Sequence, residues 1–276
     1  MMRCVAIPKA HLECDNITYS SVRAFIGTAW MRCFGLETIS GHTFAPSLLR
    51  EGGIVVDFGT NRGEFAERFL AHHSCRYYAA EANPSLTRGT ADRLGITVEH
   101  LAIAGVDGEV EFHISSNPES SSIYSTIASP TTGERVRVAS LTYDSWIQRH
   151  GISAISLLKV DIEGAELDLL ESWEWVSAQP DQIAVEFHDF SDNLQVPRIR
   201  RCIAKLKSLG YTYLNQTAPQ HIDCLFVKRS RLRGLKGFLM AAGWRGLSLF
   251  HHVRGWLRCR GWRCPFPGGE QQSSAA

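Results

Sequence analysis

Charged side chains follow an apolar run in the middle of the sequence. In ISLLKVDIEGAELDLLES, Lys159, Asp161 and Glu163 alternate where the run ends and a helical pattern begins. Alternate residues of a strand share one face, and the carboxyl ends of parallel strands open onto the ligand crevice of α/β proteins. Glu186 and His188 alternate in the same way in QIAVEFHDF. We therefore expect these five side chains to meet at one rim.

Three interpretations of these side chains are open. A carboxylate or imidazole at a crevice can remove a proton from an attacking hydroxyl or amine, so the candidate catalytic residues are Asp161, Glu186, His188 and Lys159. Alternatively, Asp161, Glu163 and Glu186, together with His188, could hold a divalent cation that lowers the pKa of a bound hydroxyl. The third interpretation is structural: Lys159 pairs with Asp161 or Glu186, and His188 is a hydrogen-bonded rim residue.

A glycine turn upstream predicts a nucleotide-containing cofactor. VVDFGTNRGEF places a strand before Asp57, Gly59 and Gly63 and a helix after them. Gly59 allows a sharp turn, and Gly63 would let the backbone approach a ligand at the helix N-terminus. The spacing lacks the middle glycine of the dinucleotide fingerprint, which argues against a nicotinamide dehydrogenase. S-adenosylmethionine has no phosphate, and we expect Asp57 to face its amino acid moiety.

The ends of the next two predicted strands offer partners for the rest of this cofactor. Glu81, in YYAAEANP, lies 22 residues past Gly59, where a carboxylate can accept both ribose hydroxyls. Ala102 and Ile103 could form the apolar adenine wall or could equally be core residues. With Asn61 from the glycine turn, the expected cofactor-binding residues are Asp57, Gly59, Asn61, Gly63, Glu81 and Ala102.

Strand-like and helical patterns alternate around these residues. Strands are predicted at 54–59, 76–82, 97–103, 109–114, 155–161, 182–188, 212–216 and 224–229, and helices at 64–73, 165–176 and 196–210. Strands separated by helices indicate βαβ units and a mostly parallel sheet. Residues 1–50 lack a clear pattern and are expected to be a helical extension, residues 51–229 the catalytic domain, and residues 230–276 an appended tail.

The composition of the 276 residues, 44% hydrophobic and 21% charged, fits one globular domain with appendages. The eight cysteines are scattered, so we expect reduced thiols in a cytoplasmic protein. Cys259 and Cys264 lack a second pair of ligands for zinc. The N-terminus shows no signal-peptide pattern, and no run of about 18 apolar residues predicts a membrane span.

The net charge of +1 conceals an uneven distribution along the chain. Ten of the 29 Lys and Arg residues lie between Lys228 and Gly269, a stretch without Asp or Glu, so the other 19 face all 28 acidic residues. Leu232, Leu235, Leu239 and further apolar residues recur there at helical spacing, with aromatic residues at Phe238, Trp244, Phe250, Trp256 and Trp262. This pattern is typical of an interfacial helix on an anionic membrane, but also of a solvated tail or of a helix that caps the sheet. No motif predicts nucleic-acid binding.

The motifs together resemble the FkbM methyltransferases. VVDFGTNRGEF, YYAAEANP, LAIAGVDGEVEFHI, LTYDSWI, LLKVDIEGAELDLLE and IAVEFH occur in the order of that family between about Gly53 and Lys228. The resemblance implies a Rossmann-like class I methyltransferase fold, with a mostly parallel sheet, an antiparallel last strand and helices on both faces. It also implies that Asp57, Gly59, Gly63 and Glu81 bind the cofactor and that Asp161, Glu163 and Gly164 belong to the hallmark motif.

The leading functional hypothesis is therefore methyl transfer from S-adenosylmethionine to an oxygen nucleophile. The resemblance implies a small-molecule, sugar or lipid-linked acceptor, without identifying it. A divalent cation is a possible addition that no motif supports, and the oligomeric state is open. The alternative is a non-catalytic, cofactor-binding or membrane-associated scaffold that retains the fold.

Overall fold

A computed structural model of the protein describes residue 31 and residues 35–233, with short gaps, and then residues 237, 240, 242–244 and 246. The gaps within 35–233 are at 88, 118–119, 126–130, 174–177, 189–194 and 219. Within these residues, every helix is too short or too polar to span a bilayer.

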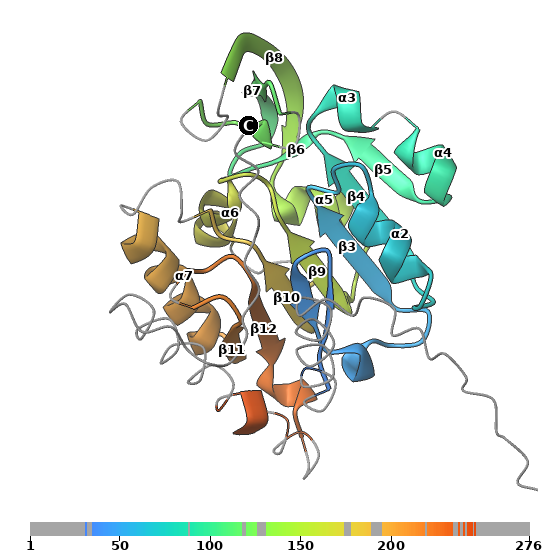
Figure 1. The fold of residues 1–276 in the computed structure, drawn as a ribbon, viewed down its shortest axis with the longest axis vertical. Coiled ribbons are helices and arrows are strands. Elements are labelled where there is room, and N and C mark those ends of the chain that lie inside the picture. The colour runs from blue at the N-terminus through green and yellow to red at the C-terminus, as the bar shows by residue number, and fades with distance from the viewer. Residues whose placement is uncertain are drawn as a thin grey trace, which may run out of the picture.

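A seven-stranded sheet forms the centre of the molecule (Figure 1). Its strands are β3 (Ile54–Phe58), β4 (Arg76–Glu81), β5 (Thr97–His100), β9 (Leu157–Val160), β10 (Gln182–Val185), β11 (Tyr211–Asn215) and β12 (Cys224–Lys228). They lie in the order β11-β12-β10-β9-β3-β4-β5. Strand β12 runs antiparallel to both of its neighbours, whereas the pairs from β10 to β5 are parallel. This arrangement confirms the expected mostly parallel sheet with an antiparallel last strand.

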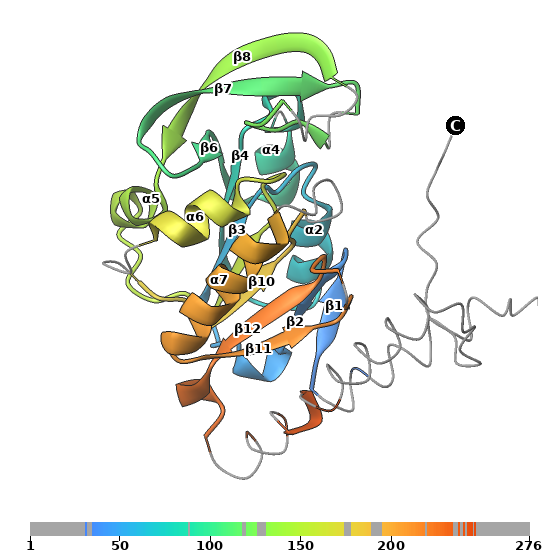
Figure 2. The same ribbon diagram turned by 90° about the vertical axis from the view of Figure 1, so that its left-hand side faces the viewer.

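Helices cover both faces of this sheet (Figure 2). The elements α5 (Tyr143–Arg149), α6 (Glu166–Ser172) and α7 (Val196–Ser208) pack on one face, and α2 (Glu64–Leu70), α3 (Pro84–Thr87) and α4 (Thr90–Leu94) follow β3 and β4. Neighbouring residues of one strand separate the two cores, because Val56 packs with α5–α7 and Val55 packs with α2. Continuous apolar strands are expected for a sheet buried on both faces.

The N-terminal extension contains a β-hairpin where we expected helix. Strands β1 (Glu37–Ile39) and β2 (His42–Phe44) pair antiparallel and are followed by the 3-10 turn η1 (Pro46–Leu48). Ser40 and Gly41 have φ angles of 44° and 85°, as a tight two-residue hairpin turn requires. Phe44 is fully buried against α2. Tertiary packing therefore stabilises this hairpin, and the sequence pattern of a three-residue strand does not reveal such packing. Residues 1–30 lie outside the described part.

A small second sheet lies over the carboxyl edge of the central sheet (Figure 1). It consists of β6 (Ala102–Ile103), β7 (Gly108–Ser115) and β8 (Thr131–Leu141), in the order β6-β8-β7. The strand predicted at 97–103 is thus divided between two sheets. Strand β8 was not predicted, because its alternation of Arg and Val follows a polar stretch without a clear boundary. Ala102, Phe112 and Val138 form a core of their own between these strands.

Part of the basic tail belongs to the folded core. After the 3-10 turn η4 (Arg229–Arg231), Trp244 is 1% exposed and packs with Leu214, Leu225 and Val227 of β11 and β12. Trp244 is therefore not available as a membrane-facing aromatic residue, contrary to our expectation. The physical reason is that a sheet buries its apolar face against another segment, and Trp244 removes the apolar face of β11 and β12 from water. The other aromatic residues of the predicted interfacial helix lie outside the described residues.

Candidate active site

A cavity lies at the carboxyl edge of the central sheet, with a volume of about 550 Å³ that includes the solvent-filled space at its opening. Its wall combines the ends of β3, β4 and β9 with the small second sheet. The lining residues are Gly59, Asn61, Ala80, Glu81, Ala82, Leu86, Leu101, Ala102, Ile103, Phe112, Ser121, Ile123, Asp161, Ile162, Glu163 and Ala165. The lining combines apolar side chains with a few carboxylates, which is typical of sites for small molecules and cofactors.

The turn after β3 forms one side of the cavity. Gly59 has a φ of 80°, and a Cβ there would lie 1.6 Å from the carbonyl oxygen of Asp161. Gly59 therefore lets the ends of β3 and β9 approach each other, in addition to turning the chain. Asn61, also at positive φ, lines the cavity. Gly63 does not line it: a Cβ there would meet Thr90 and Leu94 of α4, so this glycine allows helix packing where we expected ligand approach.

Glu81 is positioned at the end of β4 with its carboxylate toward the cavity. Its Oε2 accepts a hydrogen bond from the backbone N–H of Asn61 and its Oε1 accepts one from the backbone N–H of Asn83, both at 2.8 Å. Burial raises the pKa of Glu81, although these two hydrogen bonds and Lys159 act in the opposite direction. Each carboxylate oxygen has a second lone pair, so Glu81 can still accept two hydroxyl groups from a ligand.

Another part of the cavity wall is apolar. Leu101, Ala102 and Ile103 line it after β5, as the sequence order predicted for the last two. Phe112 of β7 and Ile123 complete this wall. Sequence analysis missed both, because nothing in the pattern showed that the small sheet folds over the cavity.

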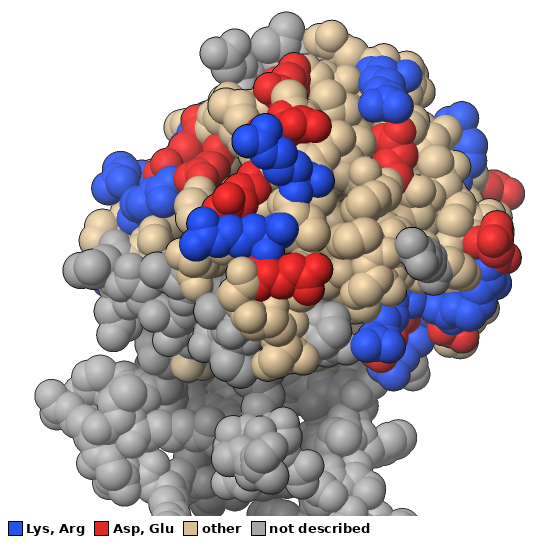
Figure 3. Space-filling model, turned by 90° about the horizontal axis from the view of Figure 1, so that it is seen from above, with Lys and Arg blue, Asp and Glu red and all other residues tan. Residues whose placement is uncertain are grey.

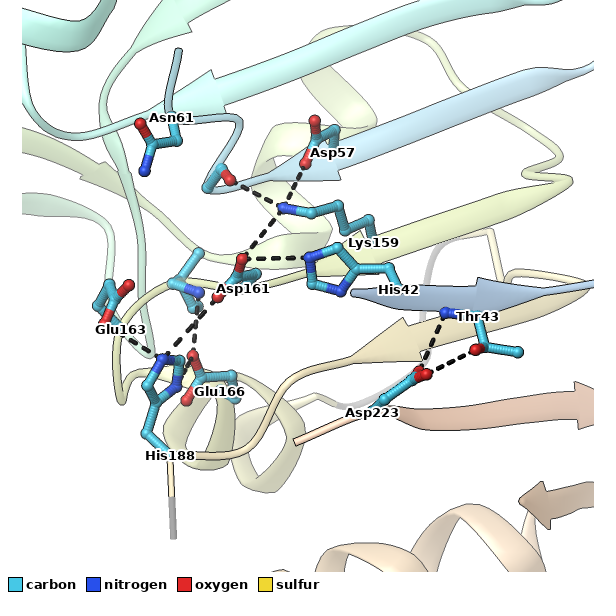
Figure 4. A network of polar contacts seen from close by, with 12 residues as sticks. His42, Thr43, Asp57, Asn61, Lys159, Asp161, Glu163, Glu166, His188 and Asp223 are labelled. Carbon is cyan, nitrogen blue, oxygen red and sulfur yellow. Dashed lines mark hydrogen bonds and ion pairs between the residues drawn. The ribbon is translucent and has the colours of Figure 1, made fainter. Parts of the chain in front are cut away.

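Asp57 and Lys159 form an ion pair behind the cavity instead of facing it (Figure 4). The Lys159 Nζ lies 3.0 Å from the Asp57 Oδ1 and donates to the carbonyl oxygen of Gly59 at 2.9 Å. The Tyr77 hydroxyl donates to the Asp57 Oδ2 at 2.7 Å. Burial lowers the pKa of Lys159, but the attraction of Asp57 and Asp161 outweighs it. These positions contradict ligand contact by Asp57 and proton transfer by Lys159, because both side chains are closed off from the cavity.

Asp161 links this ion pair to the cavity (Figure 4). Its Oδ2 lies 3.5 Å from Lys159 Nζ and 3.3 Å from His42 Nε2. Burial raises the pKa of Asp161, but Lys159 and His42 more than compensate and hold it below its ordinary value. Sequence analysis missed His42, which reaches the site from β2 of the hairpin. The signal would have been a polar residue between two apolar strands, which is too common to be specific.

His188 is held between two carboxylates. Its Nε2 lies 3.1 Å from Glu163 Oε2 and its Nδ1 lies 3.1 Å from Glu166 Oε1. Burial lowers the pKa of His188, but Glu166 and Glu163 raise it well above its ordinary value. A protonated imidazole cannot accept a proton, so the geometry favours the rim-residue interpretation of His188. Glu166, which sequence analysis did not single out, also accepts hydrogen bonds from the Ile162 and Gly164 amides.

The carboxylate of Glu186 lies close to that of Asp161. Burial and the charge of Asp161 raise the pKa of Glu186 to about 8. The ligating atoms of His42, Asp161 and Glu186 lie within 4.8 Å of one another, as do those of Asp161, Glu163 and His188. The predicted cation ligands Asp161, Glu163 and Glu186 are thus divided between two groups. In both groups Asp161 already lies 3.5 Å from the Lys159 Nζ.

Comparison with known proteins adds a family match. The sequence model described as the methyltransferase FkbM domain matches residues 57–213. Curated proteins give no match. Among solved structures, Aeropyrum pernix fibrillarin with bound S-adenosyl-L-methionine is 12% identical, with a TM-score of 0.39 and 72% of each chain covered. Human methyltransferase-like protein 13, in complex with SAH, is 11% identical, with a TM-score of 0.39 over 91% of this chain and 97% of that one. The family match includes every predicted site residue and leaves His42 outside.

Proposed function

Because the protein belongs to the FkbM methyltransferase family, we propose that it transfers the methyl group of S-adenosylmethionine to a hydroxyl oxygen. One observation supports this most strongly. One cavity is lined by the apolar Ala102 and Phe112, by the Glu81 carboxylate at the end of β4, and by Asp161 and Glu163 after β9. The strand order β5-β4-β3-β9 places Glu81 between the residues that follow β5 and those that follow β9. This order matches an adenine ring, a ribose diol and a positively charged sulfur on one elongated ligand.

The cofactor is bound by parts of three strand ends. The two oxygens of Glu81 accept the ribose hydroxyls, while the Asn61 and Asn83 amides fix the carboxylate. The adenine lies against Ala102, Ile103 and Phe112. The turn at Gly59 and Asn61 faces the amino acid moiety through its backbone, in place of Asp57. In this arrangement the protein contributes mainly the orientation of the methyl group.

Glu186 is the proposed general base. The acceptor oxygen attacks the methyl carbon, the carbon–sulfur bond breaks with its electron pair left on sulfur, and the hydroxyl proton passes to the carboxylate. Asp161 is a poor proton acceptor because Lys159 and His42 lower its pKa. Glu186 has a pKa of about 8, which is close to the pH at which proton transfer is most effective. Asp161 and Glu163 then line the approach of the acceptor.

The acceptor class rests on the family alone: a small molecule, a sugar or a lipid-linked hydroxyl compound. On the face shown in Figure 3, acidic and basic side chains are interspersed. This mixture offers little to attract a polyanion. Contact of the basic tail with an anionic membrane stays a prediction, and cosedimentation of the full chain with anionic vesicles tests it. A cytoplasmic location likewise stays a prediction.

The test is methyl transfer from methyl-labelled S-adenosylmethionine to pooled sugars, glycolipids and hydroxylated small molecules. We expect label on an oxygen atom and a rate that rises with pH toward about 8, because ionised Glu186 is the form that accepts the proton. Glu186→Gln should lower the rate by about 10²-fold or more and remove this pH dependence. Cofactor binding without transfer to any pool would favour the scaffold alternative.

A further inference from the structure

Negative charge is in excess at the end of the cavity that Asp161 and Glu163 line. The acidic cluster there consists of Asp161, Glu163 and Glu166. Lys159 lies closer to Asp57, at 3.0 Å, than to Asp161, at 3.5 Å, so its charge is largely used behind the cavity. His188 forms ion pairs with both Glu163 and Glu166. Among the described residues, carboxylates therefore outnumber cations here even when His42 and His188 are both counted as protonated.

Two members of this cluster present their charge to the ligand. The side chains of Asp161 and Glu163 are 23% and 27% exposed, and both line the cavity. Glu163 is held there by an unusual backbone, because its φ is 51°, and the Ser122 hydroxyl donates to its carbonyl oxygen. A left-handed conformation at a residue other than glycine persists only where the surroundings enforce it. The backbone that carries Glu163 is thus held in place before any ligand arrives.

The proposed function determines which ligand charge lies at this end. With adenine at the apolar end and the ribose at Glu81, the sulfur-bearing chain extends toward Asp161 and Glu163. Methyl transfer changes the charge of that chain: the positive sulfonium becomes a neutral thioether when the carbon–sulfur bond breaks. The ammonium and carboxylate of the amino acid moiety are the same in donor and product.

We propose that the acidic cluster distinguishes S-adenosylmethionine from S-adenosylhomocysteine by the charge on sulfur. The excess carboxylates attract the sulfonium of the donor and have no corresponding attraction for the thioether of the product. The cluster therefore favours exchange of product for donor after each turnover. It does not accelerate the transfer itself, because the attraction is strongest in the ground state. This inference rests on the proposed function and adds a specificity role for Asp161 and Glu163.

Isothermal titration of the full chain with the two cofactor forms tests this inference without knowledge of the acceptor. We expect the donor to bind about tenfold more tightly than the product, a difference of about 1.4 kcal/mol. Sinefungin, which carries an ammonium group in place of the sulfonium, should bind like the donor. In Glu163→Gln, the donor-to-product ratio should fall toward one while product affinity is retained, which also shows that the variant is folded.

Glu111→Gln is the matched control, because Glu111 is exposed on β7 and pairs with Arg135 away from the cavity. Its ratio should equal that of the unaltered protein. Equal binding of donor and product by the unaltered protein would overturn the inference, as would an unchanged ratio in Glu163→Gln. Absence of binding for both cofactor forms is a different result, because it would remove the proposed function as well.

Discussion

Gly59 fixes the distance between the two strand ends that carry the site. A Cβ at this position would lie 1.6 Å from the carbonyl oxygen of Asp161 and 2.7 Å from its carbonyl carbon. The Lys159 Nζ donates a hydrogen bond to the carbonyl oxygen of Gly59 and forms an ion pair with Asp57. The glycine, the lysine and the buried aspartate therefore form one structural unit on which the cavity-facing Asp161 depends.

Gly59→Ala should destabilise the fold by about 3 kcal/mol or more, because both the positive φ and the overlap with Asp161 must be relieved. Gly52→Ala is the control: its φ is 61°, but nothing lies within 4 Å of the added Cβ. There we expect only the conformational cost, about 1–2 kcal/mol. Urea unfolding of the two variants measures the difference. Equal losses of stability would show that the strand ends can separate freely.

At this scale, spacing alone predicted where residues meet but not which of them face the ligand. Alternation correctly brought Asp161, Glu163, Glu186 and His188 to one rim. It could not show that Asp57 and Lys159 neutralise each other behind the cavity, because their pairing depends on β3 and β9 being neighbours in the sheet. His42 was missed for the same reason: its partner Asp161 is more than a hundred residues away.

The β1–β2 hairpin is the element that brings His42 to the site, and Asp223 anchors it. The Thr43 amide donates to Asp223 Oδ1 at 3.0 Å, and the Thr43 hydroxyl donates to Oδ2 at 2.5 Å. Gln182 of β10 adds hydrogen bonds in both directions with the backbone of Ala45. The hairpin is thus attached to β10 and β12 through side chains, without extending the central sheet.

The anchor should make stability depend on pH. Burial raises the pKa of Asp223 from 3.8 to about 6 despite the hydrogen bonds from Thr43. Because the folded state binds this proton more tightly than the unfolded state, the contribution is full below pH 4 and is lost as pH rises through about 6.

Asp223→Asn removes this titration while keeping groups that can bond to Thr43. Between pH 5 and pH 7.5, the unfolding free energy of the unaltered protein should fall relative to that of the variant by on the order of 1 kcal/mol. Chemical denaturation at both pH values measures this. A difference that stays constant with pH would mean that Asp223 does not titrate in this range.

The elements that sequence predicted best are those with long apolar patterns. Strands β3, β4, β9 and β10 and helix α7 were predicted within a few residues. The short strands β1, β2 and β6 and the polar strand β8 were mispredicted or missed, because packing against other elements, and not local pattern, stabilises them. The sequence pattern therefore did not predict the small second sheet that covers the cavity, although it predicted the strand ends that line it.

Across the whole molecule, segments from both ends of the described chain complete the core. Leu36 and Ala45 from the N-terminal side and Trp244 from the tail cover the apolar face of β11 and β12. Met240 lies near Gly35, where an added Cβ would be 3.2 Å from its Cε. Over its described part the tail therefore covers the sheet, which is one of the three alternatives that the sequence pattern left open.

Trp244→Ala should destabilise the protein by about 3–5 kcal/mol, as expected for removal of a large buried side chain. Leu209→Ala, at a residue 36% exposed, is the comparison and should cost about 1 kcal/mol or less. Thermal unfolding of both variants distinguishes them. If Trp244→Ala unfolds at the temperature of the unaltered protein, the tail is not part of the cooperative core.

The central claim is that the cavity binds S-adenosylmethionine through Glu81. Isothermal titration of the full chain with this cofactor tests it most directly, with Glu81→Gln as the variant and the exposed Glu67→Gln as its control. We predict binding by the unaltered protein and by Glu67→Gln, at a Kd of about 1–10 μM, and binding weakened about tenfold or more in Glu81→Gln. No binding by the folded, unaltered protein, or equal binding by all three, would contradict this account.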